Sequence, residues 1–231
     1  MSEVYAFGDS VLRGVIEENG KYQFLEKSFS NICENALGIT VINKAKFGST
    51  VASGEKSLER SQKRLPLSDW RYVIFEFGGN DCDFNWPEIS ANPEKNHRPN
   101  STIEDFRRIY TGLIEKIKEM GKIPVLLSLP PVDAQRYFKK ITQGLNKANI
   151  LKWMDGNPQF ITNWHERYNL EVFKLAIGNK IPVIDITSAF LEVKNYNRLL
   201  CEDGIHPNEE GHKVIAAAIK DHIEHAENVM L

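Results

Sequence analysis

The chain lacks several features that would place it in a specialised class. Its 231 residues include three cysteines, Cys33, Cys82 and Cys201, without the spacing of a metal site, so we expect neither a disulfide framework nor a zinc site. No apolar run is long enough for a transmembrane helix. The formal net charge of −2 lacks the basic excess that nucleic-acid binders normally carry. We therefore expect no membrane span, no nucleic-acid partner and no metal.

The start of the chain leaves no room for a leader. An apolar run that we expect to form a buried strand already begins at Val4, so a signal peptide would have no segment of its own. The hydrophobic fraction of 42% and the charged fraction of 26% are typical of an ordinary soluble protein. A length of 231 residues fits one domain. The sequence therefore predicts a single cytoplasmic domain over residues 1–231.

Short apolar runs alternate with amphipathic segments along the chain. The runs predict five strands, at residues 4–7, 39–42, 72–77, 123–129 and 181–186. The segments between them predict helices, including a helix over 24–37, a charged solvent-facing helix over 53–65 and a last helix capped by Asn208. This alternation is typical of a parallel sheet covered on both faces. With right-handed crossovers, the result is a three-layer α/β/α sandwich.

Two segments do not fit this alternation. Residues 83–100 are rich in Asn and Pro and predict a long loop. Directly after that loop, Ser101 and Glu104 form a capping-box pattern that predicts the start of a helix. Residues 132–156 have a mixed character. We expect this second segment to be partly helical and consider it a candidate lid over a site.

The first strand ends abruptly at Gly8-Asp9-Ser10. A serine there would present its hydroxyl at the carboxyl end of a parallel sheet, where open α/β folds place their sites. Gly, Asp and Ser also form ordinary turns, so the tripeptide alone is not decisive. Near the other end of the chain, His206 could serve as the base that a serine hydroxyl needs, and Asp203 could hold the imidazole tautomer. Ser10, Asp203 and His206 are therefore our candidate catalytic residues.

Two further motifs each follow an apolar run, one over residues 43–50 and the other at Gly78-Gly79-Asn80-Asp81. With the serine and histidine motifs, and in this order, they resemble the SGNH hydrolases, also called GDSL esterases/lipases. The resemblance covers nearly the whole chain. It implies a five-stranded sheet in flavodoxin-like order. It also implies an oxyanion hole made by the backbone N–H groups of Ser10 and Gly48 and the side-chain amide of Asn80.

The implied activity is hydrolysis of a carboxylic ester through an acyl-enzyme, with no cofactor. The chain departs from the family pattern at Val11 and Ala45, where the family has Leu and often Gly, but neither position supplies a reacting atom. Because no long apolar segment suggests a lipid-binding surface, we favour short acyl groups, such as acetyl on a carbohydrate. Trp86 and Trp153, in the two irregular segments, are candidates for lining the substrate pocket, although core packing would explain them equally well.

Three other functions stay open. A lysophospholipase or thioesterase of the same family would use the same residues. A non-catalytic binding module would keep the fold without turnover, and loss of Ser10 or His206 would have favoured it, but both are present. A flavodoxin-like nucleotide or phosphate binder would need a phosphate cradle after the first strand, where this chain has the carboxylate of Asp9. The sequence predicts no oligomeric state.

Overall fold

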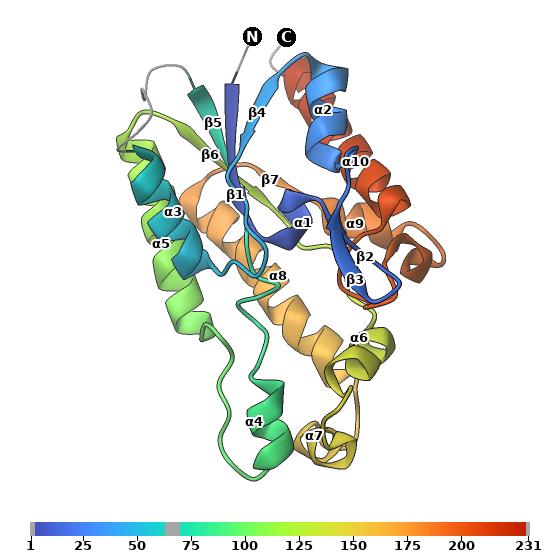
Figure 1. Cartoon of the computed structure of the whole chain (residues 1–231). Helices are drawn as coiled ribbons and strands as arrows, with labels where there is room; N and C mark the ends of the chain where they lie inside the picture. The colour runs from blue at the N-terminus through green and yellow to red at the C-terminus, as the bar shows by residue number, and fades with distance from the viewer. Residues whose placement is uncertain (1–2, 63–69, 230–231) are drawn as a thin grey trace.

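The structure, a computed structural model, describes residues 3–62 and 70–229, with side chains described up to His225. A five-stranded parallel sheet lies at its centre (Figure 1). The strands follow one another across the sheet in the order β4 (Thr40–Asn43), β1 (Glu3–Gly8), β5 (Trp70–Glu76), β6 (Ile123–Leu127) and β7 (Val183–Ile184). The first strand thus lies between the next two strands of the sheet, which confirms the flavodoxin-like order.

Side chains along the strands alternate between two apolar layers. Tyr5 and Phe7 of β1 pack in the layer beneath α3, α5 and α8, whereas Ala6 packs in the layer beneath α2, α9 and α10 (Figure 1). These helices span Val51–Gln62 (α3), Ile103–Glu119 (α5), Phe160–Asn179 (α8), Phe29–Leu37 (α2), Ile186–Leu191 (α9) and Glu209–Val229 (α10). A strand buried on both faces is apolar at every position, which explains the continuous apolar runs. The predicted α/β/α sandwich is confirmed.

A β-hairpin replaces the first part of the helix predicted over 24–37. Strands β2 (Val15–Glu18) and β3 (Lys21–Phe24) pair antiparallel after the short helix α1 (Ser10–Arg13). Asn19 and Gly20 join them with φ angles of 53° and 75°. Asn-Gly is the preferred pair for a two-residue hairpin turn, because both positions need a positive φ. Phe24 is therefore a strand residue, and α2 begins only at Phe29.

Helix α3 begins earlier than the predicted span of 53–65 and is not simply solvent-facing. One side of α3 is packed against the sheet, and a Cβ added to Gly54 would lie 2.3 Å from the ring of Phe77. Residues 63–65 lie outside the described residues. Helix α5 is capped by Thr102, whose Oγ1 accepts from the Asp105 N–H at 3.2 Å, and not by Ser101. At the end of the chain, Asn208 Oδ1 accepts from the Gly211 N–H at 3.1 Å, as expected for the cap of α10.

Three short helices form a third apolar cluster beyond the carboxyl ends of the strands (Figure 1). They are α4 (Trp86–Ala91), α6 (Ala134–Ile141) and α7 (Lys147–Trp153). The segment 83–100 is therefore not entirely a loop, because Asn85 caps α4 within it. The segment 132–156 is partly helical, as expected, and its role as a lid stays a prediction. Within the described part of the chain, no helix combines the length and apolarity needed to span a bilayer.

Strand β7 is shorter than the predicted strand over 181–186. Asp185 ends it by capping α9, and its Oδ1 accepts from the Ser188 N–H at 2.9 Å. The same stretch of β7 and α9 packs on the layer that contains α10. The order of the strands places the carboxyl ends of β1 and β5 side by side at the centre of the sheet. Side chains that follow these two strands therefore lie close to each other.

Candidate active site

Ser10 is the first residue of α1 and directly follows the turn that ends β1. Asp9 caps this helix, and its Oδ1 accepts from the Val11 N–H at 2.9 Å. Gly8 permits the turn because a Cβ there would lie 2.7 Å from the carbonyl oxygen of Glu76. The chain thus holds the Ser10 hydroxyl at the carboxyl end of a central strand, as its sequence motif predicted.

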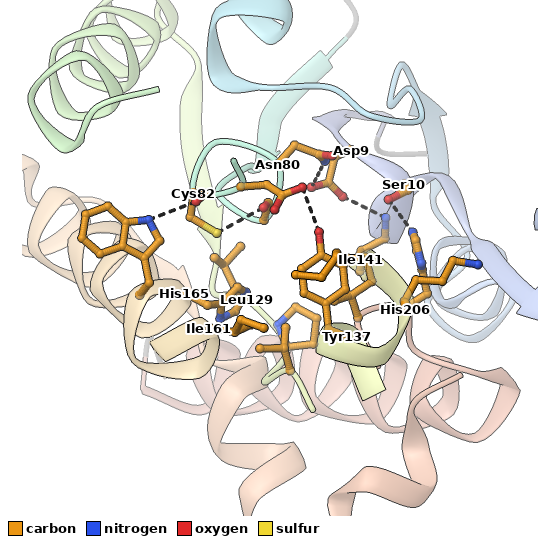
Figure 2. A pocket seen from close by; sticks show the side chains of 18 of the residues that line it. Asp9, Ser10, Asn80, Cys82, Leu129, Tyr137, Ile141, Ile161, His165 and His206 are labelled. Carbon is orange, nitrogen blue, oxygen red and sulfur yellow. Dashed lines mark hydrogen bonds between the residues drawn. The ribbon is translucent and has the colours of Figure 1, made fainter. Parts of the chain in front are cut away.

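His206 and Asp203 complete a hydrogen-bonded relay with Ser10. His206 Nε2 lies 2.8 Å from Ser10 Oγ, and His206 Nδ1 lies 2.6 Å from Asp203 Oδ2 (Figure 2 shows the serine–histidine contact). The other oxygen of Asp203 accepts from the backbone N–H groups of Ile205 and His206, both at 3.1 Å. These contacts fix the orientation of the imidazole. A hydroxyl, an imidazole and a carboxylate are therefore linked in series by hydrogen bonds, an arrangement in which an imidazole can act as a base towards a hydroxyl.

The Asp203 carboxylate is stabilised in its charged form. Burial raises its pKa, but the hydrogen bond and positive charge of His206, together with the two backbone N–H groups, outweigh burial and hold the pKa below its usual value. Asp203 is thus negatively charged at neutral pH. A charged partner at Nδ1 stabilises the imidazolium that forms when His206 accepts a proton.

The carboxyl groups on the other side of Ser10 are in a different state. Asp9 and Glu76 are buried and share a hydrogen bond. Burial raises the pKa of both groups, and the negative charge of Asp9 raises that of Glu76 further. Glu76 also accepts from the backbone N–H of Leu12 at 3.3 Å. A proton shared by these two groups is therefore held more strongly by Glu76 than by Asp9.

Asn80 is oriented by this acidic pair. Its Nδ2 donates to Asp9 Oδ2 at 2.9 Å (Figure 2). Its backbone carbonyl accepts from Asn100 Nδ2 at 2.9 Å. Asp9 accepts one N–H of the amide, and none of the described residues accepts the second N–H. Asn80 lines the same cavity as Ser10. The amide is therefore held with a donor available beside the serine.

Asp81, the next residue, joins the loops around the site. Its carboxylate accepts from the Val51 N–H at 3.0 Å and from Ser101 Oγ at 2.6 Å. These bonds hold the start of α3 and the chain before α5. Burial raises the pKa of Asp81 to about 7, although both hydrogen bonds oppose that shift. Ser101, which the sequence suggested as a helix cap, serves this contact instead.

A cavity of about 310 Å³ extends from Ser10 between the sheet edge and the third apolar cluster. Its lining includes the apolar side chains of Phe84, Trp86, Leu129, Phe160, Ile161 and Trp164. His165 also lines it (Figure 2), and its Nδ1 has no hydrogen-bond partner among the described residues. The volume is at the lower end of the range of roughly 300–1,000 Å³ found for small-molecule sites. Ser10, Asn80 and His206 line the cavity as well.

Two aromatic rings stand at the entrance to the cavity. Tyr22 meets the ring of His206 edge-on at 5.3 Å between centroids, and Phe47 stacks on the same ring at 6.1 Å. Burial and then the negative charges of Asp203 and Glu17 raise the pKa of Tyr22 to about 12, so its hydroxyl stays protonated. The sequence reasoning missed both rings. The Asn-Gly turn that sets the hairpin could have located Tyr22.

The remaining predicted site residues have different positions. Gly48 follows Phe47 with a φ of 69° and is exposed, and it is not among the residues that line the cavity. Its part in the oxyanion hole stays a prediction. Trp86 lines the cavity, with its Nε1 donating to Asp83 Oδ1 at 2.8 Å. Trp153 does not line it, which corrects that expectation, since its ring packs behind Trp86 at 6.0 Å between centroids.

The described residues contain no cluster of three or more His, Cys, Asp or Glu side chains that could hold a metal ion. Of the other buried histidines, His212 has its pKa lowered to about 4 by burial and, after that, by the charge of His206. It is therefore neutral, and its Nδ1 accepts from the Phe29 N–H at 3.3 Å. The three cysteines are free thiols and all are buried.

Comparison with known proteins gives one family. A model of the GDSL-like lipase/acylhydrolase family matches residues 6–214. An uncharacterized protein of Bacillus subtilis (strain 168), YpmR, is 22% identical over 223 residues, which cover 94% of this chain and 79% of that protein. Both matches extend over nearly the whole length of this chain, and the family model includes all of the site residues described above.

Solved structures with the same fold include two hydrolases. A lipase/acylhydrolase from Enterococcus faecalis superposes with a TM-score of 0.69 at 19% identity, covering 98% of this chain and 97% of that chain. A catalytic mutant of an acetylxylan esterase from Geobacillus stearothermophilus superposes with a TM-score of 0.63 at 19% identity, covering 94% of this chain and 92% of that chain. At these identities the likeness extends to the fold and not to a shared substrate.

Proposed function

Since the chain belongs to the GDSL-like lipase/acylhydrolase family, we propose that it is a serine esterase that cleaves carboxylic esters through an acyl-enzyme on Ser10. The observation that carries the proposal is the relay from Ser10 Oγ to His206 Nε2 at 2.8 Å and from His206 Nδ1 to Asp203 at 2.6 Å. A buried, neutral serine has no other described base at this distance. This favours catalysis over the alternative of a non-catalytic binding module.

The chemistry begins with proton transfer from Ser10 to His206 Nε2 as the serine oxygen attacks the carbonyl carbon of the ester. The tetrahedral intermediate collapses when the bond to the alcohol oxygen breaks, and His206 gives its proton to that oxygen. Water then attacks the acyl-enzyme by the same steps and releases the acid. Asp203 stays charged throughout and stabilises the imidazolium.

The negative charge that develops on the carbonyl oxygen needs donors that are already in place. The free N–H of the Asn80 amide is one. The backbone N–H of Ser10 is a second, because the first residues of a helix have no intrahelical acceptor. We assign the third donor to the N–H of Gly48, whose neighbour Phe47 already lines the cavity. The cavity beyond Asn80 is lined mainly by apolar side chains, so we place the acyl group there.

The size and lining of the cavity bear on the length of the acyl group. The preference for acetyl rested on the lack of a long apolar segment, but the cavity is lined by single residues from many separate elements. A volume of about 310 Å³ exceeds what an acetyl group fills. We propose that acyl chains of several carbons are favoured over acetyl. Acetyl on a carbohydrate stays the second candidate, because the exposed rings of Tyr22 and Phe47 could stack on a sugar.

A panel of p-nitrophenyl esters with two to twelve acyl carbons, assayed beside acetylated xylo-oligosaccharides, tests the serine mechanism and the preferred acyl length. We expect turnover that peaks at intermediate chain length and that Ser10→Ala lowers by a factor on the order of 10⁶. Because the relay supplies nucleophile and base, turnover should persist in EDTA. Ester turnover that survives in Ser10→Ala, or that requires added zinc after chelation, would contradict the mechanism. A peak at acetyl, on the oligosaccharides alone, would favour the carbohydrate esterase.

A further inference from the structure

The mechanism gives the substrate a direction in the site. His206 must deliver a proton to the oxygen of the leaving alcohol, so the alcohol lies on the His206 side of Ser10. The acyl group lies on the opposite side, at Asn80 and in the cavity. Tyr22 and Phe47 flank the imidazole and are 43% and 53% exposed. The alcohol part therefore leaves the reacting centre along these two rings.

A second hollow opens behind Phe47, which lines both it and the catalytic cavity. It has a volume of about 680 Å³ and is lined by parts of α1, α3 and the chain that follows β4. Four cationic residues line it: Arg13, Lys44, Lys46 and Arg60. No carboxylate is among the described residues that line it. We call it the basic hollow.

The cations of the basic hollow are not neutralised by any residue that the structure describes. None of the four forms an ion pair with any described residue. Arg13 lies 5.2 Å from the centre of the Phe24 ring, and Arg60 Nε donates to the Lys56 carbonyl at 3.0 Å. The whole chain has a formal net charge of −2, so this concentration of positive charge is local. A hollow lined by charges of one sign attracts ligands of the opposite sign.

A third hollow also contains cations, but carboxylates lie among them. It is lined by Arg136, Lys139, Lys140 and Arg198, but also by Glu17, Glu202 and Asp203. Arg136 pairs with Asp133 at 3.4 Å and donates to the Asn197 carbonyl at 2.8 Å. Its positive charge is thus partly neutralised within the chain. Of these two hollows, the basic hollow is the one whose cations form no ion pair with a described residue.

We propose that the basic hollow binds an anionic group, a phosphate or a carboxylate, on the alcohol part of the substrate. The proposal rests on the proposed function, because the ester bond at Ser10 fixes where the alcohol lies. The acyl chain would fill the apolar cavity, the ester would lie at Ser10, and the anion would pass over Phe47 to Lys44, Lys46 and the two arginines. Specificity would then come from the alcohol as well as from the acyl group.

Two esters with the same acyl group and nearly the same leaving group test this. They are 2-nitrophenyl butanoate, which is neutral, and 3-butanoyloxy-4-nitrobenzoate, which carries a carboxylate. The readout is the ratio of kcat/KM for the anionic ester to that for the neutral ester, which cancels differences in the active fraction of a preparation. We expect Lys44→Gln/Lys46→Gln to lower this ratio about tenfold at low salt, and the loss to shrink as salt screens the charges.

The matched control is Lys213→Gln/Lys220→Gln on α10, which removes the same charge where both lysines already pair with glutamates. It should leave the ratio unchanged. The proposal is overturned if this ratio falls equally in both double variants. It is also overturned if the ratio falls in neither of them. Failure here leaves the proposed function intact as long as the neutral ester is turned over in a manner that depends on Ser10. If no ester is turned over, the proposed function itself fails.

A competition assay identifies the source of the anion. Inorganic phosphate and phosphatidylglycerol vesicles are each added to the assay with the anionic ester. Inhibition by phosphate that Lys44→Gln/Lys46→Gln relieves assigns the hollow to a soluble ester. Inhibition by the vesicles alone, relieved by the same variant, assigns it to a lipid headgroup. Inhibition by neither probe, in the wild type, contradicts an anion site.

Discussion

Ser10 lies between two groups of buried carboxyls that are in opposite electrostatic states. On one side, Asp203 has a lowered pKa and is charged. On the other side, Asp9 and Glu76 have raised pKa values, and the pKa of Glu76 is raised further. Both groups are almost completely buried, with Asp203 and Glu76 each 1% exposed. Both sides are thus closed to solvent, and the hydrogen bonds and positive charge of His206 distinguish Asp203 from the other pair.

The difference matches two tasks. In the proposed mechanism, Asp203 faces an imidazole that becomes positively charged during the reaction, so a fixed negative charge lowers the energy of that state. Asp9 and Glu76 face an amide that must offer an N–H to a developing negative charge, where a second full negative charge would be harmful. If Asp9 and Glu76 share one proton, Asp9 can still accept from the Asn80 amide, and the pair carries one negative charge instead of two. We infer that one side of Ser10 serves proton transfer and the other serves the oxyanion.

The largest expected effect concerns the proton-transfer side. If Ser10 and His206 act as one unit, each single alanine variant should lose a factor on the order of 10⁶ in kcat, and the double variant should be little worse. The measurement is a double-mutant cycle on one ester, with circular dichroism as the control for folding. Losses that add on a logarithmic scale would mean independent roles and would remove the triad.

A matched pair of amide substitutions compares the two sides directly. Asp203→Asn should lower kcat by a factor on the order of 10⁴, because the amide cannot hold the correct imidazole tautomer. Glu76→Gln should cost less than about threefold, because the raised pKa of Glu76 favours the neutral acid, which a neutral amide resembles. The two variants are assayed at the same pH. Equal losses would show that the two sides are not in different charge states.

The dependence of stability on pH sharpens the comparison further. Asp81, next to Asn80, has a folded pKa of about 7 against an ordinary value of 3.8, so its contribution to stability is present below pH 3.8 and is lost as pH rises through 7. With the three-unit shift, the unfolding free energy should fall by up to about 4 kcal/mol. Asp203 has the opposite sign, and its contribution is lost only as pH falls through its lowered pKa.

Urea unfolding at pH 4 to 8 measures this fall. Asp81→Asn should show a smaller decrease than the wild type, because its side chain does not ionise. Asp203→Asn is the control and should keep the full decrease over the same range. Parallel curves for the wild type and Asp81→Asn would mean that Asp81 ionises in the folded protein as it does in the unfolded chain.

Asn80→Ala tests the oxyanion side. Loss of one donor should cost roughly 2.7–4 kcal/mol of transition-state stabilisation, which is about two to three orders of magnitude in kcat, with KM nearly unchanged. The competing role is a loop residue that only bonds Asp9 and Asn100. That role predicts a lower melting temperature with normal turnover per folded molecule. Measuring both quantities on one preparation separates the two roles.

The sequence predicted the parts of the site that depend on local structure. Ser10 follows a strand, Asp203 and His206 are three residues apart on one loop, and each motif is visible as a short pattern. The contact of Ser10 with His206 joins residues 196 positions apart, and only the motif order and the family resemblance indicated it. The fold was predictable for the same reason, since buried parallel strands read as apolar runs.

Other features depend on packing between distant segments and could not be predicted. Glu76 lies in a strand, and its protonation depends on burial beside Asp9, which no local pattern encodes. The cavity is assembled from single residues of many elements, so Trp86 and Trp153 looked equivalent although only Trp86 lines it. The hairpin that carries Tyr22 was missed for a different reason. The helical spacing of apolar residues from Phe24 onwards suggested a helix. The Asn-Gly turn, a local signal for a hairpin, was overlooked.

The most direct test of the account is covalent labelling of Ser10 with a fluorophosphonate, followed by tandem mass spectrometry of the tryptic peptide that ends at Arg13. The account predicts a stable phosphonyl adduct on Ser10, with labelling strongly slowed in His206→Ala and nearly normal in Glu76→Gln. An adduct on another residue, or equal labelling of Ser10 in His206→Ala and the wild type, would contradict the assignment of nucleophile and base.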